Sequence, residues 1–567
     1  MTRMRRRSFV QGTGAAATIG VLDWLGWFRS FGIPGTGKTL GMAQAVAQAA
    51  ATPHFLVYWF QEGGWDSYSM FGAVNTPNHG SVTFAPGTLN PTPPWSQQFY
   101  RPVQYGLDGT HYASKTTPVP GGGSITHGFL AEDGASLFPD MAVLSSHDGS
   151  TFHSGSRLDY HYGKYTKSLV PSAKRATNER SVMQAFCEAY GQSYALPHIS
   201  WHRWLSDGEL SEASYAPGTG YADALGPSYA HTTYGRTPAD MRNRLSSLSG
   251  IAAGAKSVAI RKFVDNLHSN FVKDHQSESV KAFDSAVKIH KSLTGGTKVA
   301  VDPAKMFTDY RAEFGVTTAD EATTSRSING NPARSKDSPN TNVQAMMAYE
   351  MMTKGLSIGF WIENRTVRGF DTHGLRKQIL SWKGQSNQLA MMRSDLWTPL
   401  KVFAAKLKST QYGTSGKSYW DFTTIVLASE MGRSIQGNVA DILASTDPDD
   451  VKYAAILEQD VSAHWKANSA AFLGGTVKGG TQFGRVGTSS LTGIPVDVNT
   501  GALDPSYDPV TGAKKAGAVA NPAAAIPDAG HIYSTALYLS GLDPVALKAA
   551  DKGQNSRPPL KFIKKSV

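Results

Sequence analysis

Cysteine is almost absent from this chain of 567 residues, which has one cysteine, Cys187. A single cysteine excludes an internal disulfide and a metal cluster held by thiolates, so His, Asp or Glu would have to bind any metal. Cys187 follows the mostly apolar residues V-M-Q-A-F at 182–186. We interpret it as a small, buried hydrophobic residue.

Long apolar runs are also absent. No stretch approaches about 18 uninterrupted apolar residues, so we expect no stable membrane span in the mature protein. Charged residues make up only 17% of the chain. The net charge is +11, but residues 1–51 contribute +5 and residues 551–567 contribute +4. This leaves +2 for the body of the chain, residues 52–550. A nearly neutral body argues against binding to a phosphate backbone, so we expect no nucleic-acid partner.

The basic segment of residues 1–51 has the features of an export signal. The sequence R-R-R-S-F-V-Q at residues 5–11 precedes small and apolar residues and an Ala-rich tract that ends near Ala51. This order is typical of a signal peptide, and R-R-S-F resembles the twin-arginine signal. We expect a periplasmic or secreted bacterial protein that uses the twin-arginine export machinery. The alternative is a basic coil followed by an amphipathic helix.

Residues 32–39, G-I-P-G-T-G-K-T, match the phosphate-binding loop pattern of NTPases in full. Such a loop binds phosphate only between a buried strand and a helix N-terminus. The preceding residues 25–31 are too short for a convincing strand and belong to the expected export signal. We interpret the match as a coincidence, and the NTPase alternative returns only if this segment is not a signal.

Three apolar segments are expected to be buried strands, and each leads into acidic or imidazole side chains. The strands are residues 55–60, 356–362 and 422–428, followed by G-G-W-D at 63–66, D-T-H-G at 371–374 and S-E-M-G-R at 429–433. Open α/β sheets bind ligands at the carboxyl ends of their strands, so these groups are expected to meet. For Asp66 alone, a turn or helix-cap role is the alternative.

A fourth expected strand, residues 141–144, precedes polar residues that we expect to form one loop. Within it, Ser154 is a candidate nucleophile and Arg157 a candidate clamp for a tetrahedral anion. The alternative is a surface loop whose hydroxyl groups bond to the local backbone.

The stretch of about residues 195–340 is expected to be a helical and loop-rich insertion. Aromatic and His side chains crowd residues 195–240, which suits either ordinary packing or the rim of a glycan site. Amphipathic surface helices are expected over residues 255–293. Further helices are expected over residues 343–354 and 386–407.

The order of these motifs resembles the bacterial exported "domain of unknown function 1501" family. The shared features are the twin-arginine start, G-G-x-D, D-T-H-G, S-E-x-G-R, His464, the G-G-x-V-K-G-G run and the C-terminal Y-S-T-A-L-Y-L-S-G-L-D-P at residues 533–544. The likeness covers most of residues 52–567, except roughly 195–340. That family is similar to the alkaline phosphatase and sulfatase superfamily, which implies an α/β fold with a mostly parallel central sheet flanked by helices.

The resemblance also implies a metal site and an activity. Its metal ligands would be Asp66, Asp371, His373, Glu430 and His464. Carboxylates and imidazoles without thiols suit a divalent Zn, Mn, Mg or Ca ion. Such an ion would polarise a phosphate or sulfate ester, so the implied function is metal-dependent hydrolysis of small-molecule or glycan esters.

Two departures from the family pattern keep a second class of function open. Relatives commonly have Asp-His where this chain has Ala463-His464, and no C/S-x-P-x-R motif supplies a sulfatase-type nucleophile. The alternative is an exported binding or scaffold protein that keeps the fold without turnover.

Overall fold

The computed structural model describes the parts of the chain from which the fold is built. These are residues 54–65, 67, 70–72, 115–121, 123–151, 153–163, 181–191, 194, 196–201, 232–234, 237–253, 302–321, 339–364, 391–433, 446, 448, 464–487, 492–550 and 557–565. The expected export signal, the G-x4-G-K-T match and the helices expected over residues 255–293 lie outside the described residues.

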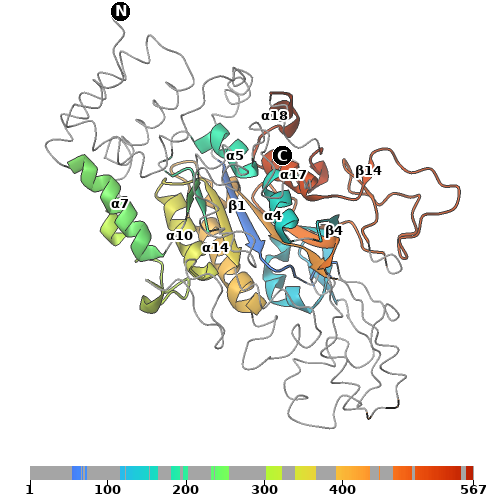
Figure 1. Ribbon diagram of the computed structural model, residues 1–567, viewed down its shortest axis with the longest axis horizontal. Helices are drawn as coiled ribbons and strands as arrows, with labels where there is room; N and C mark the ends of the chain where they lie inside the picture. The colour runs from blue at the N-terminus through green and yellow to red at the C-terminus, as the bar shows by residue number, and fades with distance from the viewer. Residues whose placement is uncertain are drawn as a thin grey trace, which may run out of the picture.

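An eight-stranded sheet forms the centre, in the order β12-β4-β11-β8-β1-β7-β5-β6 (Figure 1). The strands are β1 (Phe55–Gln61), β4 (Met141–Asp148), β5 (His198–Ser200), β6 (Thr232–Tyr234), β7 (Gly359–Asn364), β8 (Thr423–Ser429), β11 (Ala467–Gly474) and β12 (Thr481–Phe483). Parallel ladders join β8, β1, β7, β5 and β6 in series, and another joins β4 to β12. Strand β11 is antiparallel to both β4 and β8.

The expected α/β class is confirmed, but the expected mostly parallel sheet is corrected to a mixed one, because β11 reverses the direction between β4 and β8. The three strands predicted from apolar runs are present as β1, β7 and β8, and all three are buried at every position. Continuous apolar runs are typical of strands covered on both faces. Strands β5 and β6 lie within the stretch expected to be an insertion, yet both belong to the central sheet.

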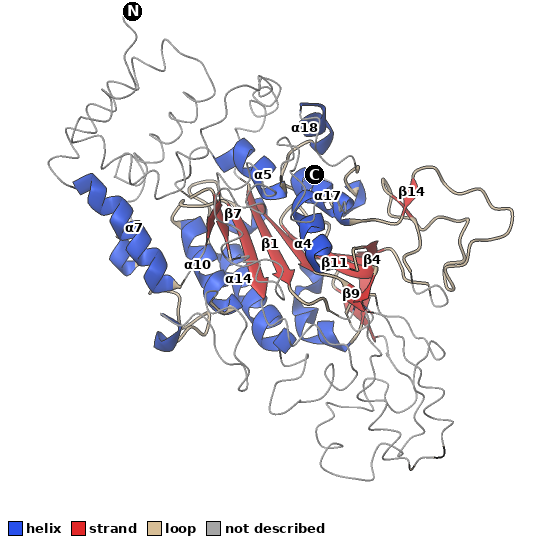
Figure 2. Ribbon diagram, in the orientation of Figure 1, coloured by secondary structure: helices blue, strands red, loops and turns tan. Residues whose placement is uncertain are grey.

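Helices cover both faces of the sheet (Figure 2). They are α10 (Thr341–Thr353) and α14 (Thr398–Ser409) on one face, and α4 (His153–Tyr162), α5 (Val182–Tyr190) and α17 (Ala529–Leu539) on the other. Trp59 of β1 packs edge-on against Phe403 of α14, with 6.2 Å between ring centroids, whereas its neighbour Phe60 packs against Tyr160 of α4 at 5.3 Å. Successive strand side chains point to opposite faces, so these contacts assign the two layers. Helix α10 confirms the helix predicted over residues 343–354.

The remaining elements are short or peripheral. They are β2 (Lys115–Val119), β3 (Gly123–His127), η3 (Phe129–Asp140), α7 (Pro238–Ala253), η8 (Pro303–Lys305), η9 (Thr318–Glu321), η10 (Arg393–Trp397), η11 (Tyr419–Phe422), β9 (Gly432–Arg433), β10 (His464–Trp465), β13 (Val496–Asp497), β14 (Ala524–Ala525), α18 (Pro544–Ala550) and η12 (Lys561–Ile563). Among the described residues, no helix has the length and apolar character needed to cross a bilayer.

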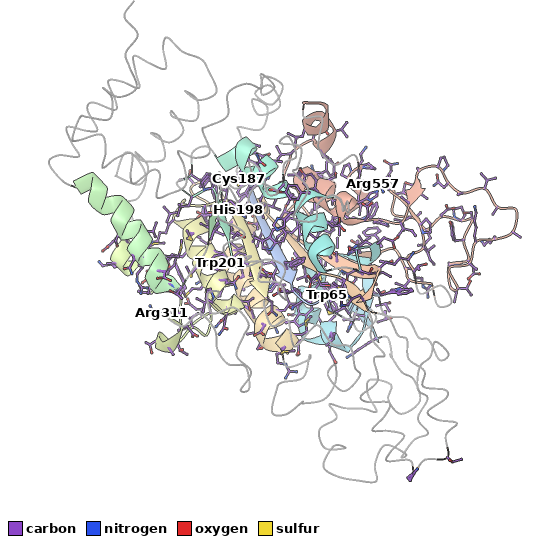
Figure 3. All side chains as sticks on the ribbon, viewed as in Figure 1. Trp65, Cys187, His198, Trp201, Arg311 and Arg557 are labelled. Atoms are coloured by element: carbon purple, nitrogen blue, oxygen red, sulfur yellow. The ribbon has the colours of Figure 1, made fainter. Side chains whose placement is uncertain are left out.

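Residues 302–321 are attached to α10 through a buried carboxyl group. Glu350 Oε2 accepts the N–H of Phe307 at 2.7 Å, and Arg311 Nε donates to the carbonyl of Phe307 at 3.0 Å. Arg311 is labelled at the left of Figure 3, close to this attachment. Burial raises the pKa of Glu350 to about 7.

Residues 492–527 form an arm that leaves the body of the protein and returns to it (Figure 1). Two turns in this arm are closed by aspartate side chains. Asp497 Oδ1 accepts the backbone N–H groups of Asn499 and Thr500, and Asp508 Oδ1 accepts those of Val510 and Thr511. The arm ends at Pro527, whose carbonyl accepts the N–H of Asp148 at 2.7 Å. This bond attaches the beginning of α17 to the end of β4.

The turn after β1 depends on two glycines. Gly63 and Gly64 have φ angles of 87° and 76°, in the region that glycine adopts without steric cost. Gly64 also lies against the residue that follows Glu430, because a Cβ atom at position 64 would be 2.6 Å from the carbonyl oxygen of Met431. The ends of β1 and β8 therefore meet through backbone contact.

Substitution Gly64→Ala is expected to destabilise the protein by about 2–6 kcal/mol, because positive φ and overpacking each cost about 1–3 kcal/mol. The matched control is Gly416→Ala, where φ is 71° and no atom lies within 4 Å of the added Cβ. The free energy of unfolding of the control variant should fall by only about 1–2 kcal/mol. Urea unfolding of both variants measures the difference, and equal losses would show that the contact with Met431 contributes nothing.

Candidate functional site

Polar side chains gather at the carboxyl edge of the sheet. Parallel strands β1, β7 and β8 end there with Gln61, Asn364 and Ser429, and Asn364 Nδ2 donates to Gln61 Oε1 at 2.7 Å. Because β11 runs the other way, its beginning lies at this edge, where Asn468 is paired with His147 of β4. Trp65, labelled in Figure 3, lies beyond the end of β1. Several strands separated in sequence thus contribute to one edge.

Glu430, predicted as an acidic ligand, lies at this edge directly after β8. Its side chain is fully buried, and its Oε2 accepts the N–H of Gly63 at 2.6 Å. Its own N–H donates to the carbonyl of Gln61 at 2.9 Å. Glu430 therefore joins the ends of β1 and β8, and one carboxylate oxygen is engaged with the backbone.

Asn468 connects the edge through five hydrogen bonds. Its Oδ1 accepts from the hydroxyls of Ser67 and Ser429 at 3.0 and 3.2 Å and from the N–H of Ser469 at 2.8 Å. Its Nδ2 donates to the Tyr160 hydroxyl at 3.2 Å and to the Ser429 carbonyl at 2.9 Å. Asn468 was not among the predicted site residues, although Asn and Ser within the apolar segment 467–474 were a signal for a buried polar network.

His147 and Tyr160 extend this network in a neutral state. His147 is completely buried, and burial lowers its pKa to about 4. Its Nδ1 is 3.4 Å from the carbonyl of Asp148, which can only accept, so Nε2 is the nitrogen that accepts from the Tyr160 hydroxyl at 3.1 Å. Burial also raises the pKa of Tyr160 well above its ordinary value. Both groups therefore keep their protons fixed near neutral pH.

A second group of charged residues lies where α17 begins. Asp528 Oδ1 is 2.8 Å from His531 Nδ1, and Asp528 Oδ2 accepts from Arg557 Nε at 2.8 Å. Burial alone would raise the pKa of Asp528, but the hydrogen bonds and charges of His531 and Arg557 outweigh it and lower the pKa. Arg557 is labelled beside α17 in Figure 3. Asp528 is therefore held as an anion between two partners.

Two other carboxyl groups, one on α4 and one on β4, have the opposite character. Asp159 of α4 is 7% exposed, and burial followed by the charge of Asp528 raises its pKa to about 8. Its Oδ1 is buried without a hydrogen-bond partner among the described residues. Burial likewise raises the pKa of Asp148. We name the "edge cluster" the set of Asp148, Asp159, Asp528, His531 and Arg557.

The predicted metal ligands are only partly within the described residues. Asp66, Asp371 and His373 lie outside them. His464 begins β10, where its Nδ1 is 3.0 Å from the carbonyl of Thr151. Within the described parts of the chain, no group of three or more His, Cys, Asp or Glu side chains is arranged to hold a metal ion. The described residues do not make a metal site on their own, and the predicted ligand set stays a prediction.

The prediction of a polar loop directly after residues 141–144 is wrong. Strand β4 continues to Asp148 because that residue still pairs with Ala467 of β11, and helix α4 begins at His153. Ser154 and Arg157 therefore lie on the first two turns of α4. Their side chains are outside the described residues, so their proposed roles stay predictions.

Comparison of the chain with protein-family models, curated proteins and solved structures finds no match. The family resemblance therefore depends on the order of the short motifs and stays a prediction.

The substitution Asp159→Asn is expected to change how stability depends on pH. Asp159 ionises near 3.8 when unfolded but near 8 when folded, so its contribution is fully present below pH 4 and is lost as pH rises to 8. The loss is at most about 1.4 kcal/mol per pH unit. Asparagine cannot ionise, so the variant should gain stability over wild type by a few kcal/mol between pH 5 and pH 8. Urea unfolding of both proteins across this pH range measures their free energies of unfolding. A difference between the two free energies that does not change with pH would contradict the prediction.

Proposed function

We propose that the protein is an exported metal-dependent hydrolase of phosphate or sulfate esters, with its site at the carboxyl edge of the sheet. The observation that carries the proposal is the meeting of polar groups at that edge from β1, β4, β8, β11 and the beginning of α17. Ligands bind at this edge in open α/β sheets. Acidic, imidazole and guanidinium groups together suit the chemistry of an anionic ester.

The buried network around Asn468 supports this proposal because it would hold a site rigidly. The hydrogen bonds of Asn468 reach three separate parts of the edge: Ser67 after β1, Tyr160 of α4 and Ser429 of β8. Rigid support of this kind reduces the cost of orienting catalytic groups. A surface loop with locally bonded hydroxyls would not need it.

The metal is part of the same proposal. Asp66, Asp371, His373, Glu430 and His464 would hold the divalent ion, and Ser154 and Arg157 would contribute a nucleophile and an anion clamp. When bound, the ion would polarise the ester and neutralise developing charge. Glu430 supports this set, since it occupies the strand end predicted for an acidic ligand. We also propose that the arrangement is alkaline phosphatase-like and that the substrate is a small-molecule or glycan ester.

An exported binding or scaffold protein is the second candidate. The observations that favour it are Ala463 in place of the expected Asp and the lack of a C/S-x-P-x-R motif in the sequence. Such a protein would bind its ligand at the same edge without turnover.

Metal analysis and ester hydrolysis by the purified protein distinguish the two candidates. We expect a bound divalent ion and hydrolysis of p-nitrophenyl phosphate or p-nitrophenyl sulfate. Substitution His373→Ala should remove both, with at least a 100-fold loss of kcat, the lower end for loss of a group that assists in the transition state. The matched control is His54→Ala, since His54 precedes β1 at the opposite edge and packs against Tyr190. Wild-type protein that binds no metal and hydrolyses neither p-nitrophenyl ester would contradict the proposal that it is an enzyme.

Export is tested separately. Replacing Arg6 and Arg7 by Lys should abolish appearance of the protein outside the cytoplasm, because the twin-arginine machinery reads this pair. Substitution Arg29→Lys, in the same segment but outside the pair, should leave export unchanged. Cell fractionation followed by immunoblotting measures both, and unchanged export of the double variant would contradict the twin-arginine proposal.

A further inference from the structure

Residues 302–321, which we name the "strap", pack against the outer helices on one face of the sheet. Tyr310 of the strap lies edge-on to Tyr349 of α10, with 4.9 Å between ring centroids. Glu313 of the strap binds Lys406 of α14 at 3.1 Å, and the same Lys406 Nζ lies 4.8 Å from the centre of the Tyr310 ring. The strap is therefore attached to α10 and α14 by side-chain contacts, outside the central sheet.

The strap turns at Phe307 in a strained backbone conformation. Phe307 has a φ angle of 65° and is the one residue other than glycine with positive φ in the described part of the chain. Bulky residues rarely adopt this region, and they stay in it only where surrounding contacts hold them there. Phe307 is also fully buried. The contacts of this residue therefore keep the strap in place, and opening of the strap would relieve the strain.

Three side chains hold the backbone at this turn. Glu350 of α10 is 1% exposed, and its Oε2 accepts the N–H of Phe307 at 2.7 Å. Arg311, labelled in Figure 3, donates from Nε to the carbonyl of Phe307 at 3.0 Å. Arg242 of α7 donates from Nη1 to the carbonyl of Met306 at 3.3 Å. One buried carboxyl group thus attaches the strained residue of the strap to α10.

The closed strap keeps water away from the Glu350 carboxyl group, and a carboxyl group without water resists ionisation. Burial raises the pKa of Glu350 to about 7, although the N–H of Phe307 and the charges of Lys354 and Arg242 favour the ionised form. The titratable and charged groups that face Glu350 among the described residues are Arg242 of α7, Asp309, Tyr310 and Arg311 of the strap, and Lys354 after α10.

We propose that Glu350 controls the attachment of the strap to α10: the strap is closed when the Glu350 carboxyl group is neutral and opens more often when it is ionised. This inference is independent of the proposed ester hydrolysis. In the open strap, water reaches Glu350 and its pKa returns to the ordinary value of 4.5. The closed strap therefore binds a proton more tightly than the open one. The resulting advantage of the closed strap is complete below pH 4.5 and is lost as pH rises to about 7.

Hydrogen exchange of the purified full chain measures opening of the strap, once each rate is divided by the rate of an unstructured chain at the same pH. In wild type, the opening constant from the amides of Phe307, Phe314 and Val316 should rise on the order of 100-fold between pH 5 and pH 8. Substitution Glu350→Gln keeps an oxygen for the N–H of Phe307 but cannot ionise. Its opening constant should be the same at both pH values.

The matched control is Glu313→Gln, which removes the carboxylate that binds Lys406 from the same strap. It should raise the opening constant equally at both pH values and keep the 100-fold rise. The amide of Val426 in β8 reports unfolding of the whole sheet and should exchange more slowly than the strap. A wild-type opening constant that does not rise with pH would overturn the inference, whether or not the variants fold. So would a rise that persists in Glu350→Gln, or a strap that exchanges only as slowly as Val426.

Discussion

Helices cover both faces of the central sheet, so the polar side chains of its central strands are concentrated at the strand ends. Strands β1, β7 and β8 are buried at every position, and their one acidic residue, Glu363, lies next to the end of β7. Polar groups at this edge therefore begin at the last residues of the strands and continue into the turn after β1 and the residue after β8. There they meet, since Glu430 accepts the N–H of Gly63. The location of the candidate site thus follows from how the sheet is covered.

The reversed strand β11 extends this edge to β4. A parallel strand would have brought its apolar end, around Leu473, to the site, whereas the antiparallel one brings Asn468 beside His147. Asn468 then satisfies the buried hydroxyl groups of Ser67 and Tyr160. An unpaired hydroxyl in the same place would cost about 1–3 kcal/mol, so this amide is central to the stability of the edge.

In the edge cluster, the burial of Asp159 raises the pKa of its carboxyl group and lowers the stability of the fold near neutral pH. Asp159 lies in a place that favours its neutral form, although an apolar or amide side chain would fill it at a lower cost in stability near neutral pH. Sites that sacrifice stability in this way are often functional. The ion pairs of Asp528 with His531 and Arg557 have the opposite effect and fix the beginning of α17.

The local features can be predicted from the amino-acid sequence: the buried strands β1, β7 and β8, the helix α10, the glycines at positions 63 and 64, and the position of Glu430 at a strand end. Apolar runs and glycine act over a few residues, and their effect is therefore readable from the chain alone. The reversed direction of β11, the role of Asn468 and the raised pKa of Asp159 follow only from the folded chain. These depend on segments hundreds of residues apart, and on burial, which shifts a pKa only after the chain has folded.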